Sequence, residues 1–441
     1  MLEKIFKLRE RGTDVKTEII AGASTFLTMA YIIVVNPAIL SKTGMPFSGV
    51  LFATVLVCAF SSIAMGLYAN LPYGVAPGMG INAFFTFTLV LGMGVRWETA
   101  LGAVFVSGII FIILSVTGVR TEITKAIPNS LRYGVAVGIG IFLALIGLES
   151  VGFVVSNKAT IIGFGNLNLV IILFLVGLIL TSILVIKNIR GALIIGITVT
   201  SVITLVTSVI GMSAGWLARP IVTIPVGIFA LPTLDVFFKL DIAGALSFGM
   251  ILPVFTLLFT DMFDSISTFL GVAEVAGLID ENGQPVNVEK ALLADAFSTT
   301  ISGLLGSSSG TTYIESAAGV REGGRTGLTA VIIGLLFLPF MFLSPLLSFI
   351  PPIATAPILV LVGVFMTQPL MKIDWKNFEE AIPAFLAVIL VPLTYSITHG
   401  IIWGFLTYTI IKVFLGKGRE VHWMLYIIDA FAILSLVSPL L

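Results

Sequence analysis

Two aspartates in the middle of an apolar segment are the residues of this chain best placed to do chemistry. Asp261 and Asp264 belong to the stretch 259–267, FTDMFDSIS, inside an apolar run from about 243 to 276. About 20 apolar residues suffice to cross a bilayer, so the run predicts a membrane helix. Spacing of i, i+3 places both carboxylates on one helical face. An ionised carboxylate at mid-bilayer costs at least ~2.5 kcal/mol, so this helix is predicted to supply half of a binding site.

The composition predicts a multi-pass membrane protein. Of 441 residues, 58% are hydrophobic and 10% are charged, whereas soluble domains carry about 25% charged residues. Lys plus Arg equals Asp plus Glu, at 23 each, which gives no indication of nucleic-acid binding. The single Cys58 and the separated His399 and His422 make neither a disulfide nor a metal site. Since ATPase and hydrolase motifs are absent, neither an enzyme nor a cofactor is expected.

Apolar runs bounded by charge, Gly or Pro predict fourteen membrane spans in two sets of seven. A charged segment precedes the first run, which is therefore expected to be a retained span rather than a signal peptide. The first set covers about 19–40, 48–69, 71–93, 98–118, 127–150, 167–187 and 191–212. The second covers about 243–271, 289–305, 308–320, 327–349, 352–371, 378–396 and 398–416. A further run, about 422–440, contains Asp429 and either crosses the membrane or lies on it.

Charge and internal similarity indicate that the two halves are inverted repeats. With a cytoplasmic N-terminus and alternating spans, 18 of the 23 Lys and Arg residues fall inside, as the positive-inside rule requires. An odd number of spans per half means that the halves enter the membrane from opposite sides. The triplet 81–83, INA, resembles 314–316, IES, and the pair Ile127-Pro128 resembles Ile350-Pro351. Inverted repeats are typical of secondary transporters, whose site lies at mid-membrane between the repeats.

The third and tenth spans begin with segments that cannot form a regular helix. Residues 71–80, LPYGVAPGMG, and 306–313, GSSSGTTY, are rich in Gly, Pro or Ser, and such breaks at matching places mark transporter sites. Asn82 and Glu315 follow the two breaks. Together with Asp261 and Asp264 they suit a small planar heterocycle with ring N–H and carbonyl groups. No Arg or Lys lies in these central stretches, which disfavours an anion.

Structural interpretations of the same residues stay open. The three carboxylates can be hydrogen-bonded to neighbouring helices, Asn82 can cap its half-helix, and Asp295 is interpreted as structural or near the interface. Gly134 and Gly138 predict a close helix contact. Five aromatic residues near the polar ones either stack on a ring or pack against helices and lipid: Phe84, Phe85, Phe259, Phe263 and Tyr313.

Four stretches carry a family resemblance: 23–37, ASTFLTMAYIIVVNP; 72–85, PYGVAPGMGINAFF; 259–264, FTDMFD; and 307–319, SSSGTTYIESAAG. The chain resembles the nucleobase–cation symporter-2 family, and more narrowly its AzgA-like branch of adenine, guanine and hypoxanthine permeases. The resemblance implies an all-α integral membrane protein with fourteen transmembrane segments in a 7+7 inverted repeat, as in uracil permease, and short extended strands in spans three and ten.

The resemblance also implies domains and roles. A core domain would comprise 1–126 and 241–350, a gate domain 127–240 and 351–416, and a hydrophobic tail 417–441. Asn82, Asp261 and Glu315 would contact the purine nucleobase, and Asp264 would take part in proton coupling. The implied protein is a proton-driven importer in the cell membrane, embedded in the lipid bilayer and dimeric through the gate domain.

Other functions stay open beside purine–proton symport. A permease of the same architecture would carry uracil, xanthine or an anion, although uracil and xanthine permeases usually have Glu rather than Asp in the eighth span. A cation channel would be lined by the carboxylates, but two broken helices in an inverted repeat favour alternating access. The motifs fit adenine, guanine and hypoxanthine equally, and they fit H⁺ or Na⁺ as the coupling ion.

Overall fold

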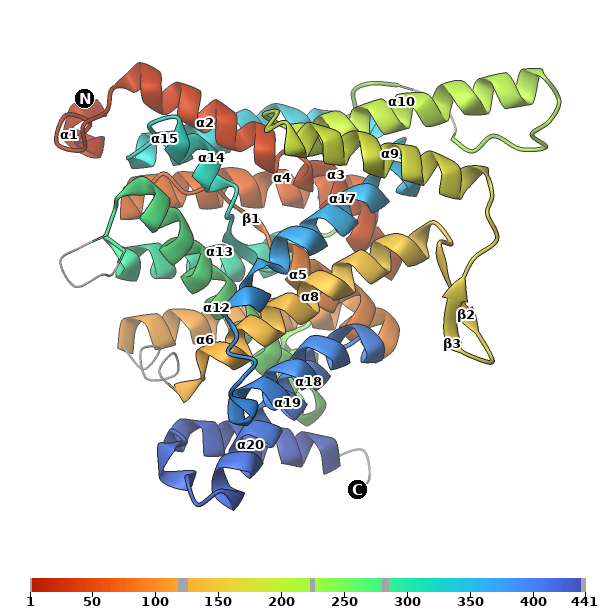
Figure 1. The fold of residues 1–441 in the computed structure, drawn as a ribbon. Helices are drawn as coiled ribbons and strands as arrows, with labels where there is room; N and C mark the ends of the chain where they lie inside the picture. Colours follow the sequence, from red (N-terminus) through yellow and green to blue (C-terminus); the bar gives the residue numbers. More distant parts are fainter. Residues whose placement is uncertain (1, 118–125, 223–226, 280–284, 438–441) are drawn as a thin grey trace.

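Long helices running in roughly one direction make up most of the molecule (Figure 1). The structure is a computed structural model that describes residues 2–117, 126–222, 227–279 and 285–437. Within these ranges nine helices are long and apolar enough to cross a membrane, and the helices lie on the predicted apolar runs. Arg120 and Lys125, the end of the run 98–118 and residues 438–440 lie outside the described residues. The chain is a multi-pass membrane protein.

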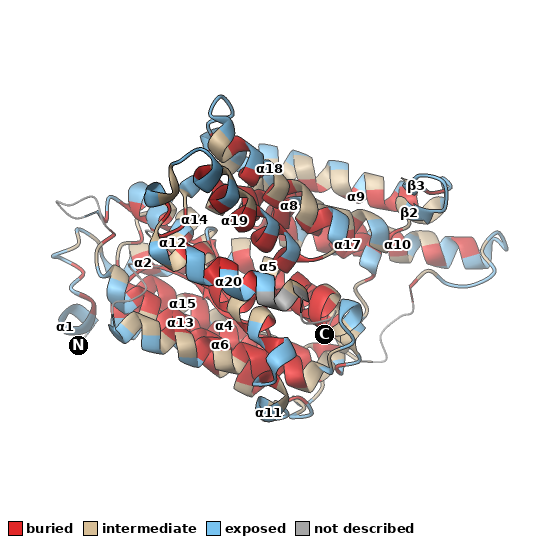
Figure 2. Cartoon of the chain, turned by 90° about the horizontal axis from the view of Figure 1, so that it is seen from below, coloured by how far each residue is buried: buried red, intermediate tan, exposed pale blue. Residues whose placement is uncertain are grey.

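Two groups of helices lie side by side, and the first is called the α4 group (Figure 2). In this group α6 packs against α13, and α15 packs against both α2 and α4. Asp14 precedes the first of these helices and accepts a hydrogen bond from the Thr17 N–H at 3.0 Å, which stabilises the helix start. The members are α2 (Val15–Met29), α3 (Ile32–Leu40), α4 (Phe47–Ala64), α6 (Trp97–Thr117), α12 (Ile251–Ala276), α13 (Val288–Leu305), α15 (Gly327–Phe337) and the π-helical segment Phe84–Gly92, which contacts α3 and α6.

The second group is called the α8 group, and its central helix packs against α17 and α18. The predicted close helix contact is confirmed here. A Cβ added at Gly134 would lie 2.7 Å from the Ala384 carbonyl oxygen, and one at Gly138 would lie 2.8 Å from that of Ala387, so the backbones of α8 and α18 approach too closely for a side chain. The members are α8 (Asn129–Ser150), α9 (Leu169–Ile186), α10 (Ala192–Ser213), α17 (Pro352–Met366), α18 (Phe378–Thr394) and α19 (Ile397–Phe414).

Short elements connect the helices. The strands β2 (Val154–Asn157) and β3 (Ile161–Phe164) form a hairpin outside the helix groups. The short helices outside the site are α1 (Leu2–Phe6), α11 (Ile242–Ala245) and α16 (Ser344–Ser348). Tight 3₁₀ turns occupy Ser41–Thr43, Phe248–Met250, Leu338–Phe342, Gln368–Lys372 and Gly418–Glu420, and π-helical segments occupy Met65–Ala69 and Phe84–Gly92.

The apolar run near the C-terminus forms one further helix, α20 (Trp423–Val437), which packs against α19 and α12. Leu425 and Asp429 face inward and are buried, whereas Trp423 and Phe431 are more than half exposed. At 15 residues the helix is about 22 Å long, which is shorter than the ~30 Å hydrocarbon layer.

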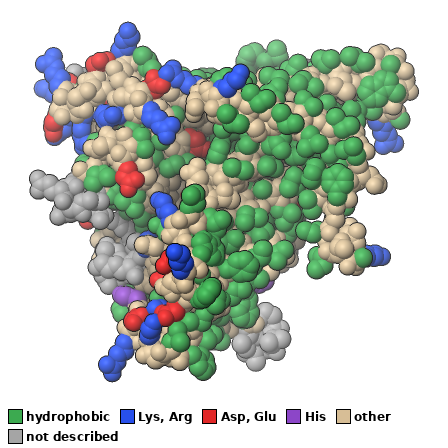
Figure 3. All heavy atoms as spheres, in the orientation of Figure 1, with side chains coloured by type: hydrophobic (Ala, Val, Ile, Leu, Met, Phe, Trp, Pro, Cys, Tyr) green, Lys and Arg blue, Asp and Glu red, His purple; other side chains and the backbone are tan. Residues whose placement is uncertain are grey.

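The surface matches a protein surrounded by lipid. Hydrophobic side chains cover a broad part of the face seen in Figure 3, whereas Lys and Arg side chains gather at the end of the molecule where α1 lies. Large apolar side chains such as Ile179, Ile186 and Phe385 are more than half exposed on helices of the α8 group, as expected where lipid tails replace water.

Candidate functional site

The two broken segments meet at the centre of the molecule as a short antiparallel ladder. The strand β1 (Val75–Pro77) pairs with β4 (Gly310–Thr312), with Ala76 opposite Thr311. The ladder continues at both ends, since the Gly78 N–H donates to the Ser309 carbonyl at 2.9 Å and the Tyr313 N–H to that of Gly74 at 3.0 Å. Pairing satisfies backbone groups that lipid cannot, which explains how these non-helical segments persist at membrane depth.

Each strand leads into a short helix that has one of the predicted site residues inside it or at its start. The helix α5 (Met79–Ala83) follows β1 and contains Asn82, and α14 (Ser316–Arg321) follows β4 and begins just after Glu315. The backbone N-cap of α5 is Gly78, without a side-chain cap bond. The interpretation of Asn82 as the cap of its half-helix is therefore wrong.

A cavity of about 380 Å³ lies beside the ladder, between the α4 group and the α8 group. Small-molecule sites typically measure about 300–1,000 Å³. Its polar lining includes Asp264 of α12 and Glu315, together with Tyr31 and Thr312. Aromatic rings form much of the rest of the wall: Tyr133, Phe259, Phe263, Tyr313, Phe365 and Phe405. A flat, partly polar ligand would find both stacking surfaces and hydrogen-bond acceptors here.

Each carboxylate that lines the cavity is held by one hydroxyl group. The Tyr31 Oη donates to Glu315 Oε1 at 2.8 Å, and the Thr311 Oγ1 donates to Asp264 Oδ2 at 3.3 Å. Both carboxylates are half-buried. No Lys or Arg within 4.0 Å forms an ion pair with either one in the part of the chain that the structure describes. Acceptor capacity therefore remains for a ligand or a proton.

Asp261 and Asn82 lie behind the cavity wall rather than on it. Both are fully buried, and neither belongs to the residues that line the cavity. The Thr299 hydroxyl of α13 donates to Asp261 Oδ2, and the Ser308 hydroxyl donates to Asn82 Oδ1. The other oxygen of Asp261, Oδ1, has no hydrogen-bond partner among the described residues. The sequence predicted one site for the four polar residues. The structure places Asp264 and Glu315 on the cavity wall and Asp261 and Asn82 in a second layer behind it.

A second buried carboxylate stands next to this layer. Asp295 of α13 accepts hydrogen bonds from the Ser265 hydroxyl and, at 3.0 Å, from the Thr312 hydroxyl, so it ties α13 to α12 and β4. This agrees with a structural role. The Ser265 and Thr311 hydroxyl oxygens lie 3.3 Å apart. Two neighbouring hydroxyl groups, those of Ser265 and Thr311, therefore lie between Asp295 and Asp264.

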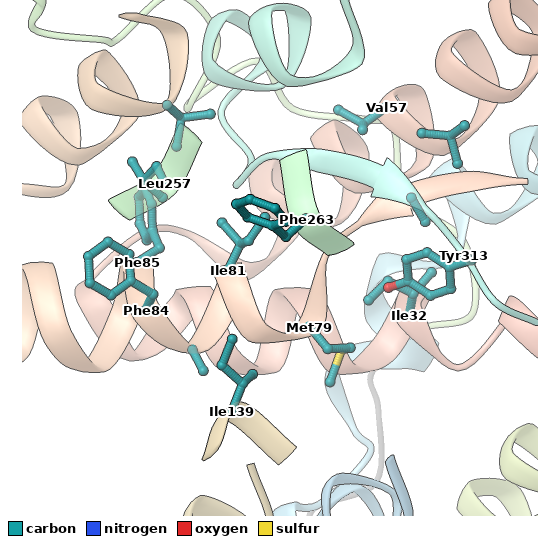
Figure 4. Close-up of a cluster of buried hydrophobic side chains, with 14 of the residues drawn as sticks. Ile32, Val57, Met79, Ile81, Phe84, Phe85, Ile139, Leu257, Phe263 and Tyr313 are labelled. Atoms are coloured by element: carbon teal, nitrogen blue, oxygen red, sulfur yellow. The ribbon is translucent and has the colours of Figure 1, made fainter. Parts of the chain in front are cut away.

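The aromatic residues divide in the same way. Phe259, Phe263 and Tyr313 line the cavity, whereas Phe84 and Phe85 are fully buried and do not line it. Figure 4 shows Phe84 and Phe85 in one buried apolar cluster with Phe263 and Tyr313. The Tyr313 Oη donates to the Pro77 carbonyl at 2.6 Å and so fixes its ring against β1. Phe259 and Phe263 pack on each other with ring centroids 4.3 Å apart.

The sequence did not indicate the contribution of the α8 group. Arg132 and Lys372 both line the cavity, although no Arg or Lys occurs near the two aspartates or the broken segments. Arg132 lies in the first turn of α8 and is one of the 18 Lys and Arg residues that the predicted topology places inside. The long side chains of Lys and Arg can bury their apolar stems along an apolar surface while the charged head group stays in water. Because Arg132 and Lys372 are far in sequence from the two aspartates and the broken segments, the sequence did not indicate that they lie beside the site.

Comparisons with known proteins identify the family. The model described as "Permease family" (Xan_ur_permease) matches residues 16–402. The chain is 42% identical to the guanine/hypoxanthine permease PbuO of Bacillus subtilis, over 98% of this chain and 99% of that protein. It is 41% identical to the adenine permease AdeP of Escherichia coli, over 99% of this chain and 96% of that protein.

A solved structure supports the fold. The transmembrane domain of the cyanobacterial bicarbonate transporter BicA matches 88% of this chain and 97% of its own, with a TM-score of 0.63 at 17% sequence identity. At that identity the likeness concerns the fold alone. The relatives, in contrast, confirm the resemblance found in the four sequence stretches. The chain belongs to the permease family, in the branch of adenine and guanine/hypoxanthine permeases that its motifs resemble.

Proposed function

We propose that the protein imports purine nucleobases across the cell membrane by proton symport through alternating access. The observation that carries the proposal is the central cavity, in which the carboxylates of Glu315 and Asp264 lie among aromatic rings. A purine presents ring N–H or amino donors on its edge and an aromatic face, and this lining complements both. The names of the relatives, an adenine permease and a guanine/hypoxanthine permease, point to the same ligands.

The proposed roles follow the two layers of the site. Glu315 contacts the purine and Asp264 carries the coupling proton, since both line the cavity. Asp261 and Asn82 are proposed to contact the purine too. Because both residues are buried behind the wall, beside Thr299 and Ser308, their contact with the purine requires a rearrangement that exposes them to the cavity.

The proposed architecture is fourteen spans in two inverted sets of seven. Two matched features support it: each broken segment passes from a short strand to a short helix, and α8 and α17 each begin after a Pro N-cap, Pro128 and Pro351. Within this architecture 1–126 and 241–350 form the core domain and 127–240 and 351–416 the gate domain, with the tail 417–441. The gate domain would also form the contact of a homodimer.

The proposed orientation places the N-terminus in the cytoplasm. Lys and Arg side chains gather at the end of the molecule that carries α1 (Figure 3), and cytoplasmic segments of membrane proteins are rich in these residues. Arg132, Tyr133 and Lys372 line the cavity near the start of α8 and the end of the turn Gln368–Lys372. The cavity would accordingly open towards the cytoplasm.

Transport of an anion is the second candidate, because one observation favours it. Arg132 and Lys372, two positively charged residues, line the cavity. Against it stand the carboxylates of Asp264 and Glu315 in the same cavity, which repel an anion when they are ionised.

Uptake of radiolabelled purine separates the two candidates. In cells that lack their own purine permeases, expression of this chain is expected to produce adenine, guanine or hypoxanthine uptake that an uncoupler abolishes. Unlabelled adenine, guanine and hypoxanthine should compete, whereas uracil, xanthine, bicarbonate and sulfate at the same concentration should not. Absence of purine uptake, together with uptake of labelled bicarbonate or sulfate by the same cells, would contradict the proposal and favour anion transport.

Cysteine labelling tests which parts of the broken segments meet the ligand. In a Cys58→Ser background, Met79→Cys and Thr312→Cys are expected to react with a small polar thiol reagent, because both residues line the cavity. Val75→Cys is the matched control, since it lies in the same ladder but is fully buried and away from the cavity. Purine should slow the reaction of the first two. Equal inertness of all three would mean that both segments are packing elements only.

A further inference from the structure

Two contacts between the helix groups lie at different levels along α8, one in its first turn and one past its middle. Near its start, the Arg132 guanidinium carbon lies 5.4 Å from the ring centroid of Phe263 on α12. Ten residues later, Phe142 packs edge-to-face against Phe87 of the α4 group, with ring centroids 6.4 Å apart. Ten residues of helix span about 15 Å, so the two contacts are well separated along the direction of the helices.

The Phe142 end is closed by packing. The Thr88 hydroxyl, beside Phe87, donates at 2.8 Å to the Tyr395 carbonyl at the end of α18, which again joins the α4 group to the α8 group. The Tyr395 ring meets Phe142 edge-to-face at 5.2 Å. None of these residues lines the cavity. At the Arg132 end the cavity itself lies between the groups, and Arg132 and Phe263 both belong to its wall.

Arg132 is held mainly by the aromatic ring. Its side chain is half-buried, and its Nε is buried without a hydrogen-bond partner among the described residues. A partly desolvated guanidinium over an aromatic face stabilises the conformation that contains it by a factor of about 2 to 30 in population. Phe263 is itself fixed by its packing on Phe259, which packs on Phe405 of α19 at 5.3 Å.

We propose that Arg132 is a positioning residue for transport, which holds the α8 group against α12 in the conformation seen here. The inference rests on the proposed alternating access. We take the α8 group to slide along the α4 group when the Phe142 end opens. Because Arg132 belongs to the first group and Phe263 to the second, this sliding separates the two residues. The cation–π contact therefore favours the state in which the cavity opens at the Arg132 end.

State-dependent labelling tests this role. Ser267→Cys in the Cys58→Ser background places a thiol on an exposed, cavity-lining position of α12. A membrane-impermeant thiol reagent is applied to either side of oriented proteoliposomes without purine, and the ratio of the two labelling rates reports the ratio of the two states. The ratio is the labelling rate from the Arg132 side divided by the rate from the Phe142 side. Arg132→Gln is expected to lower this ratio about 2- to 30-fold. Arg132→Lys, which keeps a cation for the ring, should restore most of it.

Lys372→Gln is the matched control. It removes one positive charge from the same cavity, but its ammonium lies 5.9 Å over the ring of Tyr133, which belongs to α8 itself, so it joins no part of the α4 group. Its rate ratio is expected to equal that of the wild type. An unchanged ratio in Arg132→Gln, or an equal fall in Lys372→Gln, would overturn the proposal. The labelling experiment contains no purine. A failure of purine uptake would therefore contradict the proposed function, but the labelling ratio could still be interpreted.

Discussion

Replacing Glu315 with Gln is expected to lower the affinity for purine about 10- to 150-fold while the protein still reaches the membrane. Glu315 lines the cavity and receives a single protein hydrogen bond there, from Tyr31, so acceptor positions are left for the ligand. Loss of a hydrogen bond to a charged group costs roughly 1.5–3 kcal/mol, which corresponds to that range of dissociation constants. Equilibrium binding of radiolabelled purine to purified protein measures the change.

Two further variants sharpen this experiment. Asp374→Asn removes an exposed carboxylate that does not line the cavity and should bind purine like the wild type. Asp261→Asn tests the buried layer, and the same loss of affinity is expected if the Asp261 carboxylate leaves Thr299 to meet the ligand. Normal binding by Glu315→Gln would refute the assignment of Glu315, and normal binding by Asp261→Asn alone would leave Asp261 as a support of the cavity wall.

The Asp264→Asn variant is expected to bind and exchange purine across the membrane but to lose accumulation against a gradient. Asp264 faces the cavity without an ion-pair partner in the described part of the chain. An isolated negative charge in a low-dielectric site is costly, so a carboxyl group there gains from binding a proton. Asn retains an oxygen that can accept from the Thr311 hydroxyl, but it cannot carry the proton.

Proteoliposomes with an imposed pH gradient separate coupling from binding. Wild-type protein should concentrate labelled purine inside while the gradient lasts, and an uncoupler should stop it. The Asn variant should equilibrate purine at a measurable rate and go no further. Accumulation by Asp264→Asn at the wild-type level would place the coupling proton elsewhere. Asp295, separated from Asp264 by the hydroxyl groups of Thr311 and Ser265, would then be the next carboxylate to replace.

The local features of the chain could be predicted from its sequence. Apolar runs, helix-breaking residues and isolated carboxylates each depend on neighbours within about twenty positions, and the positions of the helices agree with them. The two broken segments are examples, because 71–80 and 306–313 contain residues that cannot continue a helix. The position of Asp264 and Glu315 on the wall of a cavity could also be expected locally, since a carboxylate in an apolar segment is costly unless it faces a cavity, a partner or a ligand.

Tertiary structure decided which of these residues share a surface. Asp261 and Asp264 are one helical turn apart, yet one is buried against Thr299 and the other lines the cavity. The pairing of β1 with β4 joins residues more than 230 positions apart. Arg132 of α8 approaches Phe263 of α12 only because the two helix groups lie side by side. Side-chain spacing assigns a residue to one face of its own helix, whereas what that face meets depends on how distant helices pack together, and no local pattern encodes that.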